Sequence, residues 1–229
     1  MPISCRIFYV EIPTDLKIIY NKLNERILKS KSQLIDGQIY ELTAKFFDAE
    51  LSQNRLVCKL RYQELRYTHD MDMALKPIPD TLEVDLYFIM KSKLYVLIYP
   101  RENAQKAVYY LRQALGDKNT RPEIYKYLIS KDHMREILKR NPGIVKTCHF
   151  KGIDLPGWDS LIIFGDDIAK SQEMKEFIEQ HSIYGENYII WTLNENGWTI
   201  GISQGGSAVC WKNLDFNKWA QFVAEKFLK

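Results

Sequence analysis

Acidic side chains gather at two points in the first half of the sequence, one after a predicted strand and one at the start of the next. These side chains are Asp70, Asp72, Asp80, Glu83 and Asp85. Carboxylate oxygens are ligands that Mg²⁺ takes in proteins, and shared carboxylates hold the two ions of phosphodiester-cleaving sites. The pattern therefore supports one hypothesis, a metal-dependent phosphodiester enzyme, provided that the loop between the clusters brings them together.

The second cluster departs from the pattern of metal-dependent nucleases at one position. In those enzymes an acid-x-lysine pair supplies a lysine that assists the attacking water, whereas Glu83-Val84-Asp85 has an aspartate in that place. In the first cluster, His69 and Asp70 are adjacent on an extended chain and point to opposite faces, so they do not share an ion easily. A polar loop and exposed carboxylates are the simpler interpretation, and the enzyme is kept as an alternative.

A third motif places His149 and Lys151 on one predicted strand, with Asp154 just after it. The motif is similar to a shortened phospholipase D signature, but the aspartate comes two residues too early and the motif occurs once. The glycine pair Gly205-Gly206 lies between predicted strands and not ahead of a helix. It therefore predicts a hairpin turn and not a phosphate cradle. No cofactor is predicted.

Positive charge is concentrated in one segment, although the net charge of the whole chain is only +3. Residues 118–153 contain nine basic and three acidic side chains, whereas residues 154–195 contain nine acidic and two basic ones. Such a separation steers an anionic partner toward one surface. We expect nucleic acid to associate with the basic segment. The predicted phosphate contacts are Arg121, Lys131, Arg135, Lys139, Arg140, Lys146 and Lys151.

The apolar spacing of the first half predicts a sheet covered by helices. Strands are expected at residues 3–12, 38–48, 56–67, 82–90 and 94–99. The second and third of these are expected to pair antiparallel. Helices are expected from Thr14 or Asp15 to about residue 29, and from Pro100 to Gly116. Pro77 and Pro79 predict a loop.

The second half repeats this order of elements. Helical turns are expected at residues 122–130 and 131–140, and a helix capped by Asp166 or Asp167 is expected to reach about residue 181. A last helix begins at Asp215. Strands are expected at residues 144–150, 160–165, 188–193, 198–203 and 208–211.

These elements predict an α+β protein of two similar halves, residues 1–117 and 118–229, packed as one body. Each half combines a curved antiparallel sheet with a long C-terminal helix, which suggests a duplication. In its order of elements the chain resembles the TATA-binding-protein-like group of duplicated sheet-and-helix proteins. The resemblance covers the outline alone and implies no functional residues.

Non-enzymatic binding is the favoured class of function, because no nucleophile, base and orienting group occur together in a recognisable pattern. Within this class, association with nucleic acid is narrowly favoured. The first alternative is a protein-interaction subunit or homodimer that uses a sheet edge and the aromatic C-terminal region. The tryptophans concentrated there are Trp158, Trp191, Trp198, Trp211 and Trp219.

The distribution of apolar residues and cysteines indicates the compartment. The sequence has no apolar run near the 20 residues or so that span a bilayer and no secretory signal at its start, so no membrane association is expected. The four cysteines lie far apart in apolar contexts, without the spacing of a zinc site or a disulfide framework. Buried, reduced thiols in the cytoplasm are expected.

Overall fold

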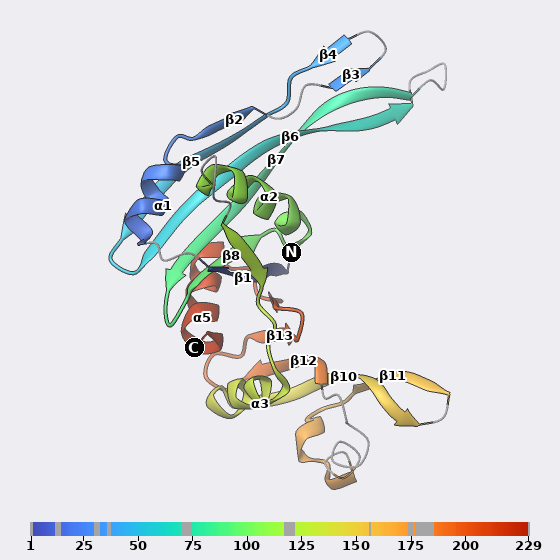
Figure 1. Cartoon of the computed structure of the whole chain (residues 1–229). Coiled ribbons are helices and arrows are strands. Elements are labelled where there is room, and N and C mark those ends of the chain that lie inside the picture. Colours follow the sequence, from blue (N-terminus) through green and yellow to red (C-terminus); the bar gives the residue numbers. More distant parts are fainter. Residues whose placement is uncertain are drawn as a thin grey trace. The chain divides into compact units, whose positions relative to one another are not determined.

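The computed structural model describes residues 2–11, 15–29, 33–35, 38–69, 75–116, 122–155, 157–173, 176 and 186–228. The fold is α+β, as predicted, and its strands pair antiparallel. The chain divides into two compact units (Figure 1). The N-terminal unit is Tyr9–Tyr125, and the C-terminal unit combines Met1–Phe8 with Lys126–Lys229. The domain division predicted between residues 117 and 118 stays a prediction.

The N-terminal unit contains an antiparallel sheet in the order β8-β7-β6-β5-β2. Its strands are β2 (Ile27–Lys29), β5 (Thr43–Ser52), β6 (Arg55–His69), β7 (Leu75–Met90) and β8 (Leu94–Tyr99). A separate two-stranded sheet joins β3 (Gln33–Ile35) to β4 (Gln38–Tyr40). The predicted antiparallel pairing of β5 and β6 is confirmed.

Two helices cover one face of this sheet, α1 (Leu16–Leu23) and α2 (Ala104–Leu115), which follows the short helix η1 (Arg101–Asn103) (Figure 1). Alternate strand residues, such as Phe46 and Leu60, are fully buried on that face. The residues between them point to the other face because side chains alternate along a strand. All five apolar residues predicted for the α2 stripe are buried, namely Ala104, Ala107, Val108, Leu111 and Leu115.

The first helix is shorter than its apolar spacing predicts. Asp15 caps α1 as expected, but the helix ends at Leu23 and the chain enters β2. Glu25 has φ of 52°, a left-handed conformation that cannot continue an α-helix. Ile27, which continues the helical spacing in the sequence, is 62% exposed. The helical spacing of Ile27 therefore does not correspond to a buried position on a helix.

The predicted loop at Pro77 and Pro79 is also wrong, because both residues lie inside β7, opposite Tyr67 and Leu65 of β6. The described pairing of β8 with β7 begins only at Asp85. Around the prolines β7 therefore has β6 as its one described neighbour in this sheet. Because Pro77 and Pro79 are two residues apart, both proline nitrogens point to the same side of β7. An edge strand tolerates proline on its outer side, where no hydrogen-bond donor is needed.

The sheet of the C-terminal unit has the order β11-β10-β12-β13-β14-β1. Its strands are β1 (Ile3–Glu11, whose last residues belong to the N-terminal unit), β10 (Gly143–Leu155), β11 (Trp158–Phe164), β12 (Glu186–Leu193), β13 (Thr199–Ser203) and β14 (Ser207–Cys210). The predicted meander at the end of the chain is confirmed. In the N-terminal unit β5 to β8 pair in sequence order, whereas here β10 lies between β11 and β12. The described strands thus give no support to a duplicated TATA-binding-protein-like arrangement.

The helices of this unit are α3 (Lys131–Arg140) and α5 (Phe216–Phe227), with the short helix η2 (Ile168–Lys170). The predicted helical turn at 122–130 is wrong, because β9 (Glu123–Lys126) lies there and Ser130 caps the start of α3. Asp167 precedes η2 but makes no capping hydrogen bond with its side chain. Residues 174–175 and 177–181 of the helix predicted here lie outside the described residues.

The C-terminal helix α5 forms as predicted. The Asp215 carboxylate accepts hydrogen bonds from the backbone N–H groups of Asn217 and Lys218, at 2.8 and 3.3 Å. This cap satisfies donors that the first turn of a helix leaves unpaired. The predicted apolar stripe is buried, and its members are Phe216, Trp219, Ala220, Val223 and Phe227.

All four cysteines are buried and none forms a disulfide, as predicted. Burial raises the pKa of the Cys5 thiol to about 12 and also raises the pKa values of Cys58 and Cys210. A raised pKa lowers the thiolate fraction at neutral pH, and the thiolate is the reactive form. No helix in the described ranges is long and apolar enough to cross a membrane.

Buried thiols predict a measurable protection from thiol reagents. At pH 8 the native protein should react with an aromatic disulfide reagent only as fast as it opens, whereas in denaturant all four thiols should react at once. Absorbance of the released thiolate measures both rates. A native thiol that reacted as fast as a small-molecule thiol would contradict this burial.

Candidate functional site

Three of the predicted phosphate contacts lie along one side of α3. Lys131, Arg135 and Lys139 are spaced four residues apart, so they form one stripe on the helix surface. Arg135 and Lys139 are exposed, and Lys131 is half-buried. The other side of α3 is buried through Met134 and Ile137. This arrangement places the stripe on the side of α3 away from its buried residues, with Arg135 and Lys139 at the surface.

Two other predicted contacts are neutralised by acidic neighbours. Arg140 forms an ion pair with Glu136 one turn before it on α3. Lys146 of β10 lies 2.7 Å from a carboxylate oxygen of Asp166, and this hydrogen bond lowers the pKa of Asp166. Of the remaining two contacts, Arg121 is outside the described residues, as is the side chain of Lys151. The basic segment is therefore less positive at its surface than its composition suggests.

The carboxylates of the enzyme hypothesis do not share a face. Asp80 lies 2.7 Å from the Arg66 guanidinium and, by strand alternation, points to the face opposite that of Glu83 and Asp85. Asp70 and Asp72 lie outside the described residues. The described residues contain no group of three or more histidine, cysteine or acidic side chains able to hold a metal. Of the three described carboxylates, Glu83 and Asp85 thus share a strand face and Asp80 does not.

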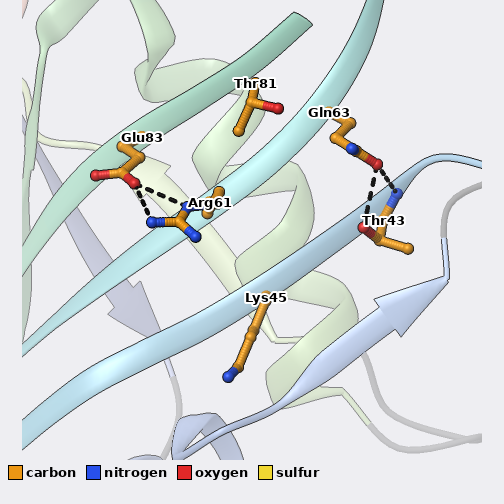
Figure 2. Close-up of a pocket in the computed structure, with 6 residues that line it drawn as sticks. All are labelled: Thr43, Lys45, Arg61, Gln63, Thr81 and Glu83. Atoms are coloured by element: carbon orange, nitrogen blue, oxygen red, sulfur yellow. Dashed lines mark hydrogen bonds and ion pairs between the residues drawn. The ribbon is translucent and has the colours of Figure 1, made fainter. Parts of the chain in front are cut away.

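The uncovered face of β5, β6 and β7 is polar and holds a shallow cavity of about 350 Å³, shown in Figure 2. Its lining residues are Thr43, Lys45, Arg61, Gln63, Thr81 and Glu83. The Gln63 side-chain oxygen accepts hydrogen bonds from the backbone N–H and the hydroxyl of Thr43, both at 3.2 Å. Arg61 donates from Nε to Glu83 at 2.8 Å and lies 4.9 Å from the centre of the Phe47 ring.

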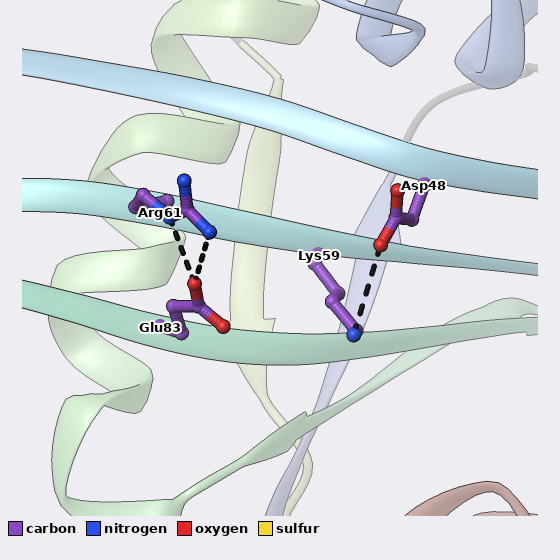
Figure 3. A network of polar contacts seen from close by, with 4 residues as sticks. All are labelled: Asp48, Lys59, Arg61 and Glu83. Atoms are coloured by element: carbon purple, nitrogen blue, oxygen red, sulfur yellow. Dashed lines mark hydrogen bonds and ion pairs between the residues drawn. The ribbon is translucent and has the colours of Figure 1, made fainter.

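Cations on this face are matched by carboxylates, as Figure 3 shows for two pairs. Arg61 binds Glu83, and Lys59 lies 3.7 Å from Asp48, which sits at an irregularity in the pairing of β5. Lys45 forms an ion pair with Glu25. Exposed pairs of this kind contribute about 0–1 kcal/mol each. Each of these three cations on this solvated face is therefore already paired with a carboxylate.

Among the described residues, an apolar strand at one end of the sheet of the C-terminal unit has no partner on its outer side. Strand β11 ends the order of described strands, with β10 as its one neighbour. Phe164 is 75% exposed and Ile162 is 50% exposed. Between Ser160 and Phe164 the strand carries no charge and no proline.

The backbone of β11 also has hydrogen-bonding groups directed away from the sheet. The N–H of Gly165 donates to the carbonyl of Lys146 at 3.0 Å, so Gly165 faces β10. Backbone groups alternate along an antiparallel strand, and the register is regular from Ser160 to Phe164. The N–H and C=O groups of Ser160, Ile162 and Phe164 therefore point to the open edge.

The sequence predicts docking at a sheet edge but does not indicate that β11 is the strand. The run Leu161-Ile162-Ile163-Phe164 is continuous in apolar character, which is typical of a buried strand. Its place at the edge depends on the order of strands, which local spacing does not encode. The absence of charge and proline from this run indicates an unprotected edge only once the order of strands is known.

The tryptophans divide between core and surface. Trp191 and Trp219 are fully buried, whereas Trp211 is 45% exposed. Trp198 is half-buried, with its ring centre 5.4 Å from that of Phe222. The side chain of Trp158 lies outside the described residues. Trp211 is thus the most exposed of the tryptophans whose side chains are described.

Comparison with known proteins gives no further guide. The chain matches no protein-family model and no curated protein sequence. Any functional statement therefore depends on the chain's own residues.

Proposed function

We propose that this protein is a non-enzymatic interaction subunit that docks another protein chain on the open edge of β11. The observation that carries the proposal is the combination of outward backbone hydrogen-bonding groups with the exposed side chains of Ile162 and Phe164. An extended strand is the structure that satisfies such an edge, by adding to the sheet. The four buried thiols are consistent with work in the cytoplasm, a reducing compartment.

Unprotected apolar edge strands are rare on monomeric proteins. Natural proteins protect an edge strand with lysine, proline, a bulge or a covering element, because an open edge pairs with other chains. The five residues from Ser160 to Phe164 carry none of the protecting side chains. An apolar, uncharged edge is therefore best explained by a partner that covers it.

Site-specific photo-crosslinking in cells tests the proposal. A benzophenone amino acid replaces Phe164 in one variant and Tyr109 of α2 in the control, since Tyr109 is also an exposed aromatic residue, at 49%. We expect a discrete protein adduct from position 164 and none from position 109. No adduct at position 164, or the same adducts at both positions, would contradict the proposal.

Nucleic-acid binding through α3 is a second candidate. The supporting observation is the stripe formed by Lys131, Arg135 and Lys139, which presents three cations at the spacing of one helical turn. Phosphate contacts of this kind supply affinity without sequence specificity. The ion pairs of Arg140 and Lys146 reduce the number of contacts below the seven predicted from the sequence.

This second candidate predicts a modest salt dependence. Three phosphate contacts on duplex DNA give a slope of log K against log salt of about −2.7, since each contact contributes about −0.9. The variant with Lys131→Gln, Arg135→Gln and Lys139→Gln should lose binding in fluorescence anisotropy. A control with Lys17→Gln, Lys91→Gln and Lys106→Gln has the same net charge and alters exposed lysines of the N-terminal unit. Equal losses in both variants, or no binding at low salt, would exclude α3 as the site.

A further inference from the structure

We propose that the partner of the β11 edge is a second copy of this chain, joined by antiparallel pairing of β11 with β11 about a two-fold axis at Ile162. This inference rests on the proposed function, because it names the occupant of the same edge. It adds a symmetry and a register. Both follow from which groups of β11 point outward.

The outward backbone groups of β11 are complementary to themselves. With the axis at Ile162, Ser160 of one copy faces Phe164 of the second copy, and Ile162 faces Ile162. Each of these three residues directs both its N–H and its C=O to the edge. Three facing pairs that each exchange two hydrogen bonds give six bonds, the full set available between Ser160 and Phe164.

The side chains agree with this register on both faces of the strand. Leu161 of one copy faces Ile163 of the other, and Ile162 packs on Ile162, so apolar residues face apolar residues. Asp159 faces Gly165, so no like charges lie directly opposite each other, a juxtaposition that destabilises strand pairs. Moving the axis by one residue to Leu161 places Ser160 opposite Ile162 and Asp159 opposite Ile163. The axis at Ile162 is therefore favoured over an axis at Leu161.

Two copies that meet through one short strand make a small interface. A symmetric contact of this type is isologous and closes at two copies, because each copy contributes the same open side of β11 and that side is then occupied. Small interfaces fall in the weak class. We expect a dissociation constant on the order of 1–100 μM.

Sedimentation velocity at protein concentrations from about 1 to 300 μM tests the inference, with dissociation constants in that range expected for a weak interface. Wild type should shift from monomer to dimer. Ile162→Lys should stay monomeric, because two ammonium groups would face each other at the axis. Ile18→Lys is the matched control, since Ile18 of α1 is 48% exposed. It should dimerise as the wild type does.

Circular dichroism establishes that each variant is folded. If Ile162→Lys fails to fold, Phe164→Lys replaces it, because the more exposed Phe164 contributes less to the core. A wild type that stays monomeric at the highest concentration, or edge variants that dimerise like the wild type, would overturn the inference.

The crosslinking experiment separates this failure from failure of the proposed function. An adduct between position 164 and a second copy supports both proposals. An adduct with a different protein, together with a monomeric wild type, overturns the self-pairing and leaves β11 as a docking edge. No adduct overturns both.

Discussion

Gly206→Ala should lower the free energy of unfolding by more than about 3 kcal/mol, since it combines backbone strain with a steric overlap. Gly206 has φ of 70°, a conformation that costs alanine about 1 kcal/mol or more. A Cβ atom there would also overlap the backbone carbonyl oxygen of Tyr127 and lie 3.3 Å from that of Ile7. Both neighbours are backbone, so they cannot move aside as a flexible side chain would.

Gly197→Ala is the matched control, because it tests strain without overlap. Gly197 has φ of 66° in the turn before β13, and a Cβ there meets nothing within 4 Å. It should cost about 1 kcal/mol, from the left-handed conformation alone. Urea unfolding followed by fluorescence measures both. Equal losses would mean that the close approach at Gly206 relaxes without cost.

The turn at Gly206 matters for the position of α3. The N–H of Ile7 donates to the Gly206 carbonyl at 2.8 Å, and the N–H of Tyr127 donates to the Ile7 carbonyl at 3.1 Å. A third bond, from the N–H of Ile129 to the Gln204 carbonyl at 3.0 Å, leads the chain into α3. Disturbance of this turn should therefore loosen the start of α3 as well as the sheet.

Trp219→Ala should lower the free energy of unfolding by about 3–5 kcal/mol, the usual cost of removing a buried indole. Trp219 is fully buried on α5, and its ring centre lies 5.6 Å from that of Phe222 and 6.3 Å from that of Phe227. Removal would leave a cavity in the aromatic core of the C-terminal unit. The edge strand β11 depends on the same sheet, so dimerisation should weaken in parallel.

Trp211→Ala supplies the comparison for Trp219. Trp211 is 45% exposed, so its truncation leaves an open surface and no cavity. Its cost should stay below about 1 kcal/mol, as for most surface substitutions. Thermal unfolding of the two variants measures the difference. Similar melting temperatures would show that the α5 core is loosely packed.

Helices with a clear cap and an unbroken apolar stripe were predictable from the sequence. The cap at Asp215 and the stripe through Trp219 define α5, whereas α2 is defined by its apolar stripe alone, because Asn103 makes no capping hydrogen bond with its side chain. Local sequence rules failed where the pairing of strands in the sheet opposed them. Pro77 and Pro79 break a central strand, but the position of β7 beyond the reach of β8 accommodates them.

The candidate sites were harder to predict, because they depend on contacts between distant residues. The composition of residues 118–153 indicated a basic surface, and three cations do align on α3. The pairing of Lys146 with Asp166 arises because β10 and β11 are adjacent, and charge counting along the chain does not show it. The open edge at β11 likewise appears only once the order of strands is known.

Hydrogen exchange of the β11 amides distinguishes a strand paired with a second copy from an unpaired one. As protein concentration rises through the dimerisation range, exchange at Ser160, Ile162 and Phe164 should slow, because their N–H groups become bonded to the second copy. Exchange at Ile163, already directed toward β10, should change little. Dimerisation with unchanged, rapid exchange at Ile162 and Phe164 would contradict the account.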